Sequence, residues 1–355
     1  YRFQLVRSGS SQNFLWGISK LSKESLRICV IGCGGYANTV MTETKGLSGV
    51  EFSFASRDFA KAESYRNKFS GVKAYGSYEE ALADDDNDAV YIFSPHDLHL
   101  GHAEMAATAG KHVLVEKPMA RTIEEAQRMI ECARSNGVNL MVAENYRFVP
   151  ALDKALDVMK AAGENGIGQL RSIRITCEGY REPSEWRRSL RRTGGGVFID
   201  GGIHFVNLLI SLGGFPERIS ATWLPKVFKS SEGEDGINLL ARLPKGASGT
   251  ILFSRATNIS GTRQHVTVDG GRGRLTFMPY GSEVILEKGA TKRKIRTSKS
   301  YRGTRKMVIE FRESIIENRE PVMSGEKGLD DLSIVLASYR SAESLTEVTP
   351  RQYSL

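Results

Sequence analysis

Two stretches of the chain carry side chains whose types and spacing suit proton transfer. Lys117, within Glu116-Lys117-Pro118, directly follows an apolar, strand-like run, and a lysine held partly away from water can exchange protons near neutral pH. Asp200 and His204 follow a run of glycines and are four residues apart, so a helix would place both on one face. Histidine titrates near neutral pH, and a neighbouring carboxylate fixes its tautomer. The alternatives are a surface lysine, a helix cap and a buried structural histidine.

Metal binding is a weaker interpretation of the same residues. Zinc sites need several His, Cys or carboxylate ligands, and no further histidine or cysteine lies at a useful spacing from Asp200 and His204. The four cysteines are too few and too scattered for a disulfide framework. We therefore predict no bound metal, and reduced thiols in a cytoplasmic protein.

A glycine-rich turn near the start of the chain predicts a phosphate-binding site. The sequence Gly32-Cys33-Gly34-Gly35-Tyr36-Ala37 lies between an apolar run and a helix-compatible stretch, and fits the pattern G-x-G-x-x-A. The first glycine of that pattern permits a tight turn, the second lets the backbone approach a diphosphate, and the small last residue lets the helix pack on the sheet. The N–H groups at the helix N-terminus then bind the phosphates. The alternative is a tight turn without a ligand.

The end of the next strand-like run bears on which dinucleotide is bound. NAD-binding proteins usually place an acidic residue there to accept the ribose 2′-hydroxyl. Here Ser56 occupies that position, and Arg57 follows with a guanidinium group that suits a 2′-phosphate. This pattern favours NADP over NAD. In the alternative, Arg57 is a surface residue and Asp58 contacts the ribose of NAD.

These motifs need elements that hold them at one edge of a sheet. In the first half of the chain, strand-like runs alternate with helix-compatible stretches, which is typical of βαβ units and a parallel sheet. The runs are almost entirely apolar, as strands are when helices cover both faces. They are residues 26–31, 50–55, 89–93, 112–115 and 139–143. Ligands of such sheets bind at the carboxyl ends of the strands, where the glycine turn and Lys117 both lie.

The second half of the chain has a different pattern. After a helical stretch from Pro150 to about Ala162, more openly alternating runs with short gaps predict a mainly antiparallel sheet. These runs are residues 172–178, 218–223, 236–243, 248–254, 264–269, 273–277 and 282–286. We therefore predict an α/β protein, with a doubly wound Rossmann domain over residues 25–148 and an α/β domain with a large open sheet over residues 149–355. Residues 1–24 are predicted to be an N-terminal extension or a remnant of expression.

Charge and hydropathy narrow the range of partners. The 355 residues include 49 Lys and Arg against 41 Asp and Glu, a formal net charge of +8, which favours an anionic partner. Nucleic-acid binders concentrate such charge in one patch. Here it is spread, apart from an arginine cluster at 187–192 and a run from Lys292 to Lys306, which we interpret as solvated faces or small-anion contacts. No apolar run reaches the roughly 18 residues of a membrane helix. We predict neither nucleic acid nor a membrane as partner.

Together the motifs resemble those of the glucose–fructose oxidoreductase, inositol dehydrogenase and rhizopine-catabolism (Gfo/Idh/MocA) family, over about residues 26–346. They occur in the family's order, and the segment that ends in Glu116-Lys117-Pro118 is the most specific. The motifs are the turn from Gly32 to Ala37; Ser94-Pro95 followed by His99; Ala109-Gly110-Lys111-His112-Val113-Leu114-Val115-Glu116-Lys117-Pro118; Asn145-Tyr146-Arg147-Phe148; Trp186-Arg187; and Asp200-x-x-x-His204.

The resemblance implies an NAD(P)-dependent oxidoreductase that transfers a hydride between the nicotinamide and a hydroxyl or carbonyl of a sugar, polyol or inositol. It implies that His204 is the general acid/base, that Lys117 polarises the reacting oxygen or shares its proton, and that Asp200 orients substrate or histidine. It also implies a homo-oligomer, a dimer or tetramer. The residues expected at the cofactor are Gly32, Gly34, Gly35, Tyr36, Ala37, Ser56, Arg57, Ser94, Pro95, His99, Glu116, Lys117, Asn145, Trp186 and Arg187, and position alone suggests Tyr180 and Arg181 at the substrate.

Two departures from the family pattern affect the interpretation. Ser56-Arg57 stands where many NAD-using members have an acidic residue, which favours NADP. Asn207 stands where many members carry an acid shortly after the histidine, which leaves the substrate open. Two rival functions remain: a dehydrogenase of a non-sugar substrate such as a dihydrodiol, and a non-catalytic NADP sensor or scaffold. A pure binder would not need Lys117 and His204.

Overall fold

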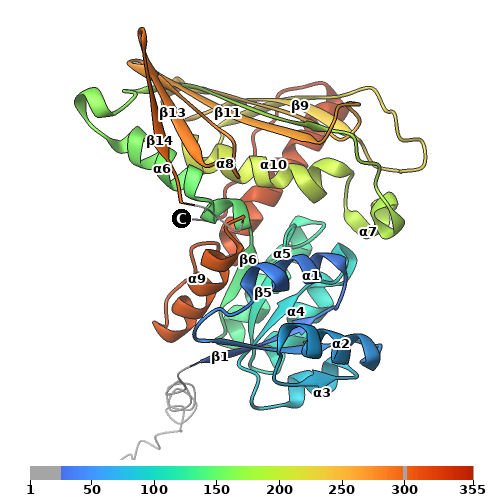
Figure 1. Ribbon diagram of the computed structural model, residues 1–355. Helices are drawn as coiled ribbons and strands as arrows, with labels where there is room; N and C mark the ends of the chain where they lie inside the picture. Colours follow the sequence, from blue (N-terminus) through green and yellow to red (C-terminus); the bar gives the residue numbers. More distant parts are fainter. Residues whose placement is uncertain (1–24, 299–301, 355) are drawn as a thin grey trace, which may run out of the picture.

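The computed structural model describes residues 25–298 and 302–354. The extension expected over residues 1–24 therefore lies outside the described residues. The described chain forms two domains, each built on one sheet (Figure 1). A six-stranded sheet occupies the first domain, and an eight-stranded sheet occupies the second.

The first domain is a parallel sheet with strand order β3-β2-β1-β4-β5-β6, which is the order of a dinucleotide-binding Rossmann fold. Its strands are β1 (Leu26–Ile31), β2 (Val50–Ala55), β3 (Ala74–Tyr75), β4 (Ala89–Ile92), β5 (His112–Glu116) and β6 (Leu140–Ala143). Its helices are α1 (Gly35–Thr44), α2 (Phe59–Phe69), α3 (Tyr78–Ala83), α4 (His99–Thr108) and α5 (Ile123–Ser135). The predicted doubly wound sheet is confirmed. Strand β3 was not predicted, because two residues are too few to show a period.

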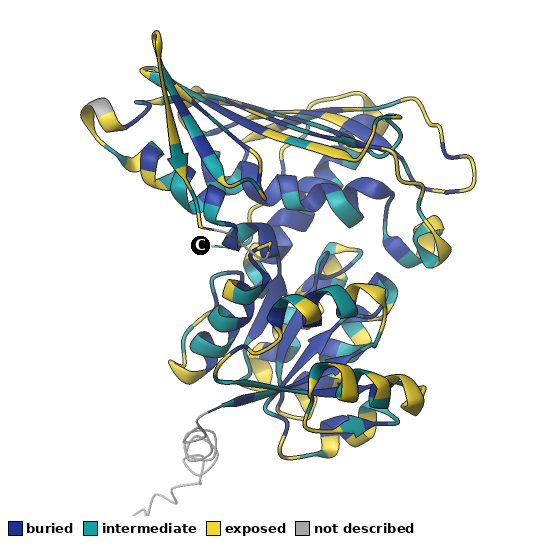
Figure 2. Ribbon diagram, in the orientation of Figure 1, coloured by how far each residue is buried: buried dark blue, intermediate teal, exposed yellow. Residues whose placement is uncertain are grey.

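Local sequence explains where the helices begin and why the strands are rigid. Ser77 Oγ accepts a hydrogen bond from the Glu80 N–H at 3.1 Å, and Thr122 Oγ1 accepts one from the Glu125 N–H at 3.2 Å, so α3 and α5 start at favourable N-caps. Strand β4 is buried at every position, and the interior of the domain is dark in Figure 2. The carboxyl ends of the strands are therefore held in fixed positions.

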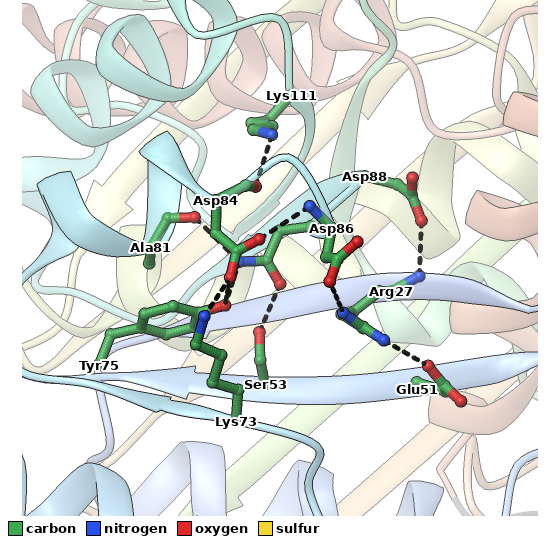
Figure 3. A network of polar contacts seen from close by, with 11 residues as sticks. Arg27, Glu51, Ser53, Lys73, Tyr75, Ala81, Asp84, Asp86, Asp88 and Lys111 are labelled. Atoms are coloured by element: carbon green, nitrogen blue, oxygen red, sulfur yellow. Dashed lines mark hydrogen bonds and ion pairs between the residues drawn. The ribbon is translucent and has the colours of Figure 1, made fainter. Parts of the chain in front are cut away.

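The amino ends of these strands carry charges that pair with one another (Figure 3). Asp84 accepts hydrogen bonds from Lys73 Nζ at 2.6 Å and from Tyr75 Oη at 2.8 Å. The Asp84 backbone oxygen accepts another from Lys111 Nζ at 2.9 Å. Arg27, near the start of β1, forms ion pairs with two acidic side chains. We call these residues the amino-edge network. Arg27, Asp84 and Lys111 lie at the opposite edge of the sheet from the glycine turn, whereas Tyr75 is the last residue of β3 and reaches the network through its hydroxyl.

The second domain has strand order β14-β13-β12-β11-β7-β10-β9-β8, and every neighbouring pair is antiparallel except β7 and β10. The predicted mainly antiparallel sheet is thus confirmed. Its strands are β7 (Leu170–Gly179), β8 (Arg218–Trp223), β9 (Gly236–Arg242), β10 (Ser248–Ser254), β11 (Thr262–Gly270), β12 (Gly273–Phe277), β13 (Glu283–Lys288) and β14 (Thr291–Arg296). Its helices are α6 (Pro150–Lys160), α7 (Leu190–Thr193), α8 (Ile203–Gly213), α9 (Thr304–Ile316) and α10 (Gly325–Ser344).

Helices cover one face of the large sheet and leave the other open. In Figure 1, α6, α8 and α10 lie beneath the sheet, between it and the first domain. Strand β9 alternates buried and exposed residues, as expected when one face is packed and the other is solvated. Helix α9 instead packs into the first domain, where Met307 and Phe311 join the core that contains Ile28 of β1. The division near residue 148 therefore separates the two sheets but not all of the packing.

Two segments differ from what the sequence suggested. Part of the basic run from Lys292 forms the edge strand β14, whose side chains are mostly exposed. Leu190–Gly213 is long and apolar enough, by length and composition, to cross a membrane, so the expectation that no apolar run reaches this length was wrong. However, 72% of its most apolar stretch is buried inside the protein. It includes α8, and we interpret it as the core helix beneath the large sheet.

Candidate active site

A cleft of about 1200 Å³ brings residues of both domains together. From the first domain it is lined by the glycine turn and by residues that follow β2, β4 and β5; from the second it is lined by residues within 181–187, 197–204, 255–264 and 278–281. The strand ends that line it are carboxyl ends, where ligands of doubly wound sheets bind. Lys117, Asp200 and His204 all line this cleft.

The geometry of the glycine turn fits a diphosphate. Gly32 has a φ of 100°, which glycine adopts readily, and a Cβ there would lie 3.4 Å from the Phe93 backbone. A Cβ at Gly34 or Gly35 would meet no atom within 4 Å, so the space beside the turn is open. Helix α1 begins there, and its N-cap, Gly34, has no side chain to occupy the first N–H groups. Ala37 is fully buried, as close packing of helix on sheet requires.

The residues after β2 divide between the protein and the cleft. Ser56 is buried, and its hydroxyl accepts a hydrogen bond from the Asp58 N–H at 3.2 Å. The Asp58 carboxylate caps α2 through the Ala60 N–H and lies 3.8 Å from Lys61 Nζ. Arg57 is exposed, lines the cleft and forms no ion pair with any described residue. Asp58 is thus engaged at the helix, whereas the Arg57 guanidinium is open to the cleft.

His99 ties together the ends of two neighbouring strands. Its ring is fully buried, with Nε2 2.8 Å from the Ser94 backbone oxygen and Nδ1 3.0 Å from that of Pro118. Burial lowers the pKa of His99 to about 3, and His96 nearby also lowers it, so the ring is neutral. Ser94 and Pro95 line the cleft, as does His99. His99 therefore fixes this wall of the cleft and carries no charge.

Lys117 reaches from the end of β5 toward the segment that carries Asp200. Its ammonium group donates a hydrogen bond to the Asp200 backbone oxygen and lies 4.0 Å from the Asp200 carboxylate. The side chain is only 11% exposed, so it is held largely away from water. The preceding residue, Glu116, accepts a hydrogen bond from Tyr91 Oη at 2.7 Å. Burial raises the pKa of Glu116 to about 7, although Lys117 lowers it.

Asp200 lies in a π-helical turn, Phe198–Gly202, that leads into α8. Its carboxylate is 3.1 Å from Arg187 Nε and 3.5 Å from His96 Nε2. Burial by itself would raise the pKa of Asp200. The hydrogen bond from His96 and the charges of Lys117 and Arg187 outweigh burial and hold this pKa well below its usual range. Asp200 is therefore ionised at neutral pH and fixes the cations around it.

His204 pairs with Glu144 and not with Asp200. Its Nδ1 lies 2.7 Å from Glu144 Oε1, and Tyr146 stacks on its ring at a centroid distance of 4.3 Å. Burial lowers the pKa of His204, and Glu144 only partly offsets this. The ring is therefore neutral near pH 7; we assign its proton to Nδ1, which donates to Glu144. Nε2 then keeps its lone pair and has no partner among the described residues. Of the two roles expected for Asp200, orienting the histidine is not supported, since the Asp200 carboxylate meets Arg187 and His96 instead; orienting the substrate stays a prediction.

Three residues of this site were not predicted from the sequence. Glu144 directly follows β6 and is 1% exposed; its position after a parallel strand matches that of Lys117 after β5 and was the available signal. His96 lies next to Pro95, and its ring packs edge-on against Trp186 at 4.8 Å. Tyr146 was noted only as part of a motif, because stacking between distant segments leaves no trace in local spacing.

The remaining predicted residues divide between the cleft wall and its support. Trp186 and Arg187 line the cleft, with the guanidinium 4.4 Å from the centre of the indole ring, and Arg181 lines it as well. Tyr180 is exposed, packs against Phe228 at 5.2 Å and lies outside the lining of this cleft. The suggested substrate contact of Tyr180 therefore has no support, whereas that of Arg181 is compatible with the geometry.

Asn145 is also outside the lining of this cleft. Its side-chain amide donates hydrogen bonds to Tyr280 Oη at 3.2 Å and to the Arg302 backbone oxygen at 2.6 Å. Tyr280 and Arg302 do line the cleft. Asn145 thus supports the wall and is not placed to contact a cofactor directly. Within the part of the chain that the structure describes, no group of three or more His, Cys, Asp or Glu could hold a metal ion.

Comparison with known proteins assigns the family. The profile of an oxidoreductase family with an NAD-binding Rossmann fold matches residues 26–144, and that of the Gfo/Idh/MocA C-terminal domain matches residues 156–276. A mouse trans-1,2-dihydrobenzene-1,2-diol dehydrogenase is 32% identical over 271 residues, 74% of this chain and 78% of the mouse protein. The chain belongs to the Gfo/Idh/MocA family.

Other relatives extend the similarity to nearly the whole chain. A D-xylose 1-dehydrogenase [NADP(+)] of Haloarcula marismortui is 26% identical over 95% of this chain and 96% of its own length. The crystal structure of an aldose–aldose oxidoreductase from Caulobacter crescentus, complexed with glycerol, superimposes with a TM-score of 0.82, at 26% identity, over 92% of this chain and 99% of that one. The expected family, fold and NAD(P)-dependent oxidoreductase activity are confirmed.

Proposed function

We propose that this Gfo/Idh/MocA protein is an NADP(H)-preferring dehydrogenase of a polyhydroxylated, sugar-like substrate, with His204 as its acid/base and Lys117 as the group that polarises the reacting oxygen. One observation carries the proposal. The two proton-carrying side chains, from different domains, meet in the same cleft as an open phosphate turn. The glycine turn from Gly32 to Ala37 would hold the phosphates of a bound dinucleotide, whose nicotinamide would supply the hydride chemistry.

His204 is suited to take the hydroxyl proton of the substrate during oxidation. Its Nδ1–H is held by Glu144, so Nε2 presents a lone pair to the cleft. When Nε2 gains the proton, the resulting imidazolium has the Glu144 carboxylate beside it, 2.7 Å from Nδ1, which offsets the cost of a buried charge. In the reverse direction the same nitrogen returns the proton to the product oxygen. Stacking on Tyr146 keeps the ring in place.

Lys117 supplies positive charge at the reacting oxygen. A cation there stabilises the oxygen as it loses its proton during oxidation, and polarises the carbonyl during reduction. The backbone oxygen and carboxylate of Asp200 fix the ammonium group in position. Asp200 therefore positions Lys117 and Arg187, whereas Glu144 positions His204.

Arg57 is the basis of the proposed NADP preference. It is exposed at the cleft beside the end of β2, where the 2′ position of the adenine ribose lies in Rossmann domains. Asp58, the alternative contact for a 2′-hydroxyl, is held by the N-terminus of α2 and by Lys61. A guanidinium group binds phosphate through charge and paired N–H groups.

A dihydrodiol is the second candidate substrate, because the mouse relative at 32% identity is a trans-dihydrobenzenediol dehydrogenase. We further propose that the open face of the large sheet joins copies of this chain into a dimer or tetramer, since β9 exposes Leu240 there. A cytoplasmic location is proposed from the cysteines, all of which are free.

Titration of the protein with NADPH and, separately, with NADH, followed by nicotinamide fluorescence, tests the cofactor half of the proposal. Turnover is then measured with the preferred cofactor on a panel of aldoses, polyols, inositols and a trans-dihydrodiol. We expect tighter NADPH binding and turnover of a polyhydroxylated compound. Tight binding without turnover of any panel member would favour a non-catalytic sensor, and preference for NADH would assign the ribose contact to Asp58.

A further inference from the structure

The reacting end of the cleft carries two guanidinium groups that no acidic side chain of the described chain pairs with. We propose that the natural substrate is an anionic polyol, whose carboxylate or phosphate group binds Arg255 and Arg181. The inference rests on the proposed dehydrogenase function, because it names the substrate class of the same cleft. The net charge of +8 agrees with an anionic ligand.

Arg255 lies beside the residues that would perform the reaction. It directly follows β10 and lines the cleft. A Cβ at Gly201 would lie 3.3 Å from Arg255 Nη2, so the guanidinium group touches the residue that follows Asp200. Arg255 therefore lies at the same end of the cleft as the substrate group that would react at His204.

The Arg255 guanidinium is held in place but not paired. It lies over the Phe253 ring, 5.0 Å from the ring centre, and its Nη1 is 3.4 Å from Thr262 Oγ1. The side chain is half-buried and forms no ion pair with any described residue. The hydroxyl occupies only one of the five N–H donors of the guanidinium group. The other donors remain for a ligand.

Arg181 places a second guanidinium on the same wall. Its backbone N–H donates to the Arg255 backbone oxygen at 2.8 Å, so the two residues are neighbours across adjacent segments. Arg181 is exposed, lines the cleft and, within the described residues, forms no ion pair. Because both residues line the cleft, an anion bound at this wall is attracted by both charges.

The acidic side chains that line this part of the cleft contact other residues or are exposed to water. Asp200 is held by Arg187 at 3.1 Å and by Lys117. Glu182 lies 3.6 Å from Arg188 and accepts a hydrogen bond from Ser230. Glu185, the other acidic residue of this wall, is exposed to water. None of them forms an ion pair with the two arginines.

A neutral sugar would leave these guanidinium groups partly desolvated without a counter-charge, which costs free energy. A carboxylate or phosphate accepts paired hydrogen bonds from such a group and offsets that cost. The cofactor phosphates do not meet this need, because the glycine turn that binds them belongs to the first domain, whereas Arg181 and Arg255 belong to the second.

Calorimetric titration of the protein saturated with NADPH tests the inference with three matched probes: D-gluconate, D-glucitol 6-phosphate and D-glucitol. The reduced cofactor cannot oxidise these alcohols, so binding is measured without turnover. We expect at least one anionic probe to bind about tenfold or more tightly than D-glucitol, as expected for a charge-assisted hydrogen-bond pair. The tighter anion distinguishes a carboxylate from a phosphate substrate. The preference should weaken as salt rises.

Arg255→Gln, and separately the exposed Arg181→Gln, should remove about tenfold of the anion preference while D-glucitol binds as before. Arg128→Gln is the control: it removes the same charge from an exposed ion pair with Glu104 in the first domain, and neither residue lines the cleft. Equal binding of all three probes, binding of none, or an anion preference that survives both cleft variants would overturn the inference. Nicotinamide fluorescence in the same samples separates the two proposals, because loss of NADPH binding would count against the proposed function itself.

Discussion

The two edges of the Rossmann sheet hold their charges in opposite ways, and strand β5 shows the difference within a single strand. Lys111, just before the strand, is buried and donates a hydrogen bond to the Asp84 backbone oxygen in the amino-edge network (Figure 3). Lys117, just after the strand, lines the cleft. Both lysines have polar partners, but only the second also faces a space in which a ligand can bind. Exposure to the cleft, and not residue type, therefore separates the structural lysine from the functional one.

The same contrast appears in the titration of the carboxyl and imidazole groups. The hydrogen bonds that Asp84 accepts from Lys73 and from the Asp86 N–H hold its pKa well below the usual range, so its charge contributes to folding. At the carboxyl edge, burial raises the pKa of Glu116 to about 7 and lowers that of His204. Groups whose pKa burial shifts away from its usual value are typical of reaction sites.

The largest expected effect is the loss of turnover in Lys117→Ala. We expect kcat to fall by about 10²- to 10⁴-fold, the usual contribution of one positioned proton-transfer or polarising group. The melting temperature and NADPH affinity should change little, because the side chain faces the cleft. Steady-state kinetics and fluorescence titration measure both quantities.

Lys111→Ala is the matched control for Lys117→Ala on the same strand. It removes a buried hydrogen bond and should lower the free energy of unfolding by about 1–2 kcal/mol, with kcat unchanged. The comparison between the two edges would fail if Lys111→Ala lost turnover under conditions in which it is fully folded. It would also fail if Lys117→Ala kept turnover close to that of the wild type.

Glu144→Gln should lower kcat by about 100-fold, because His204 loses the carboxylate that stabilises its protonated form. This change also moves the pH profile. The Glu144 carboxylate raises the pKa of His204, so its removal shifts the acidic limb of kcat/KM toward lower pH. A merely structural role would reduce activity equally at every pH. Asp331→Asn, at a buried acid bonded to Asn207 at 2.9 Å, serves as a control that leaves His204 paired.

The sequence located the site through rules that act over short distances. The glycine pattern and the position of Lys117 after a strand both depend on residues close together in the chain, and the structure places them as expected. Strand bounds such as Ala89–Ile92 agreed with the predicted runs to within one or two residues, because apolar runs bounded by turn residues define buried strands.

The pairing of charges across the cleft was not predictable from the sequence. The spacing of Asp200 and His204 suggested that they contact each other, but the π-turn and the partners on other strands decide otherwise. Glu144 lies 60 residues from His204 along the chain. Only the order of strands in the sheet brings β6 beside β5 and so places this carboxylate under the histidine.

Asp84→Asn tests the structural edge, with an expected loss of about 1–3 kcal/mol in the free energy of unfolding at pH 7. The pKa of Asp84 is lower in the folded protein than in the unfolded chain, so its contribution is complete above the unfolded value of about 3.9 and is lost as the pH falls below it. Urea unfolding at pH 7 and at about pH 2–3, where the carboxyl group of the unfolded chain is mostly protonated, should therefore show the gap to the wild type narrowing. A gap that is independent of pH would mean that the ionised form contributes nothing, and a fall in kcat would contradict a purely structural role.

Arg57→Ala has the smallest expected effect and tests whether a charge at the carboxyl edge reaches out to a ligand. NADPH binding should weaken by about tenfold while NADH binding changes by less than about twofold, because only NADPH carries the 2′-phosphate. Arg66→Ala, on α2, is the control, because Arg66 pairs with Glu63 at 2.6 Å and does not line the cleft. Fluorescence titrations of both variants with both cofactors give the ratio directly. Equal losses of affinity for the two cofactors would mean that Arg57 has a structural role. The contact with the 2′ position of the ribose would then be assigned to Ser56 or Asp58.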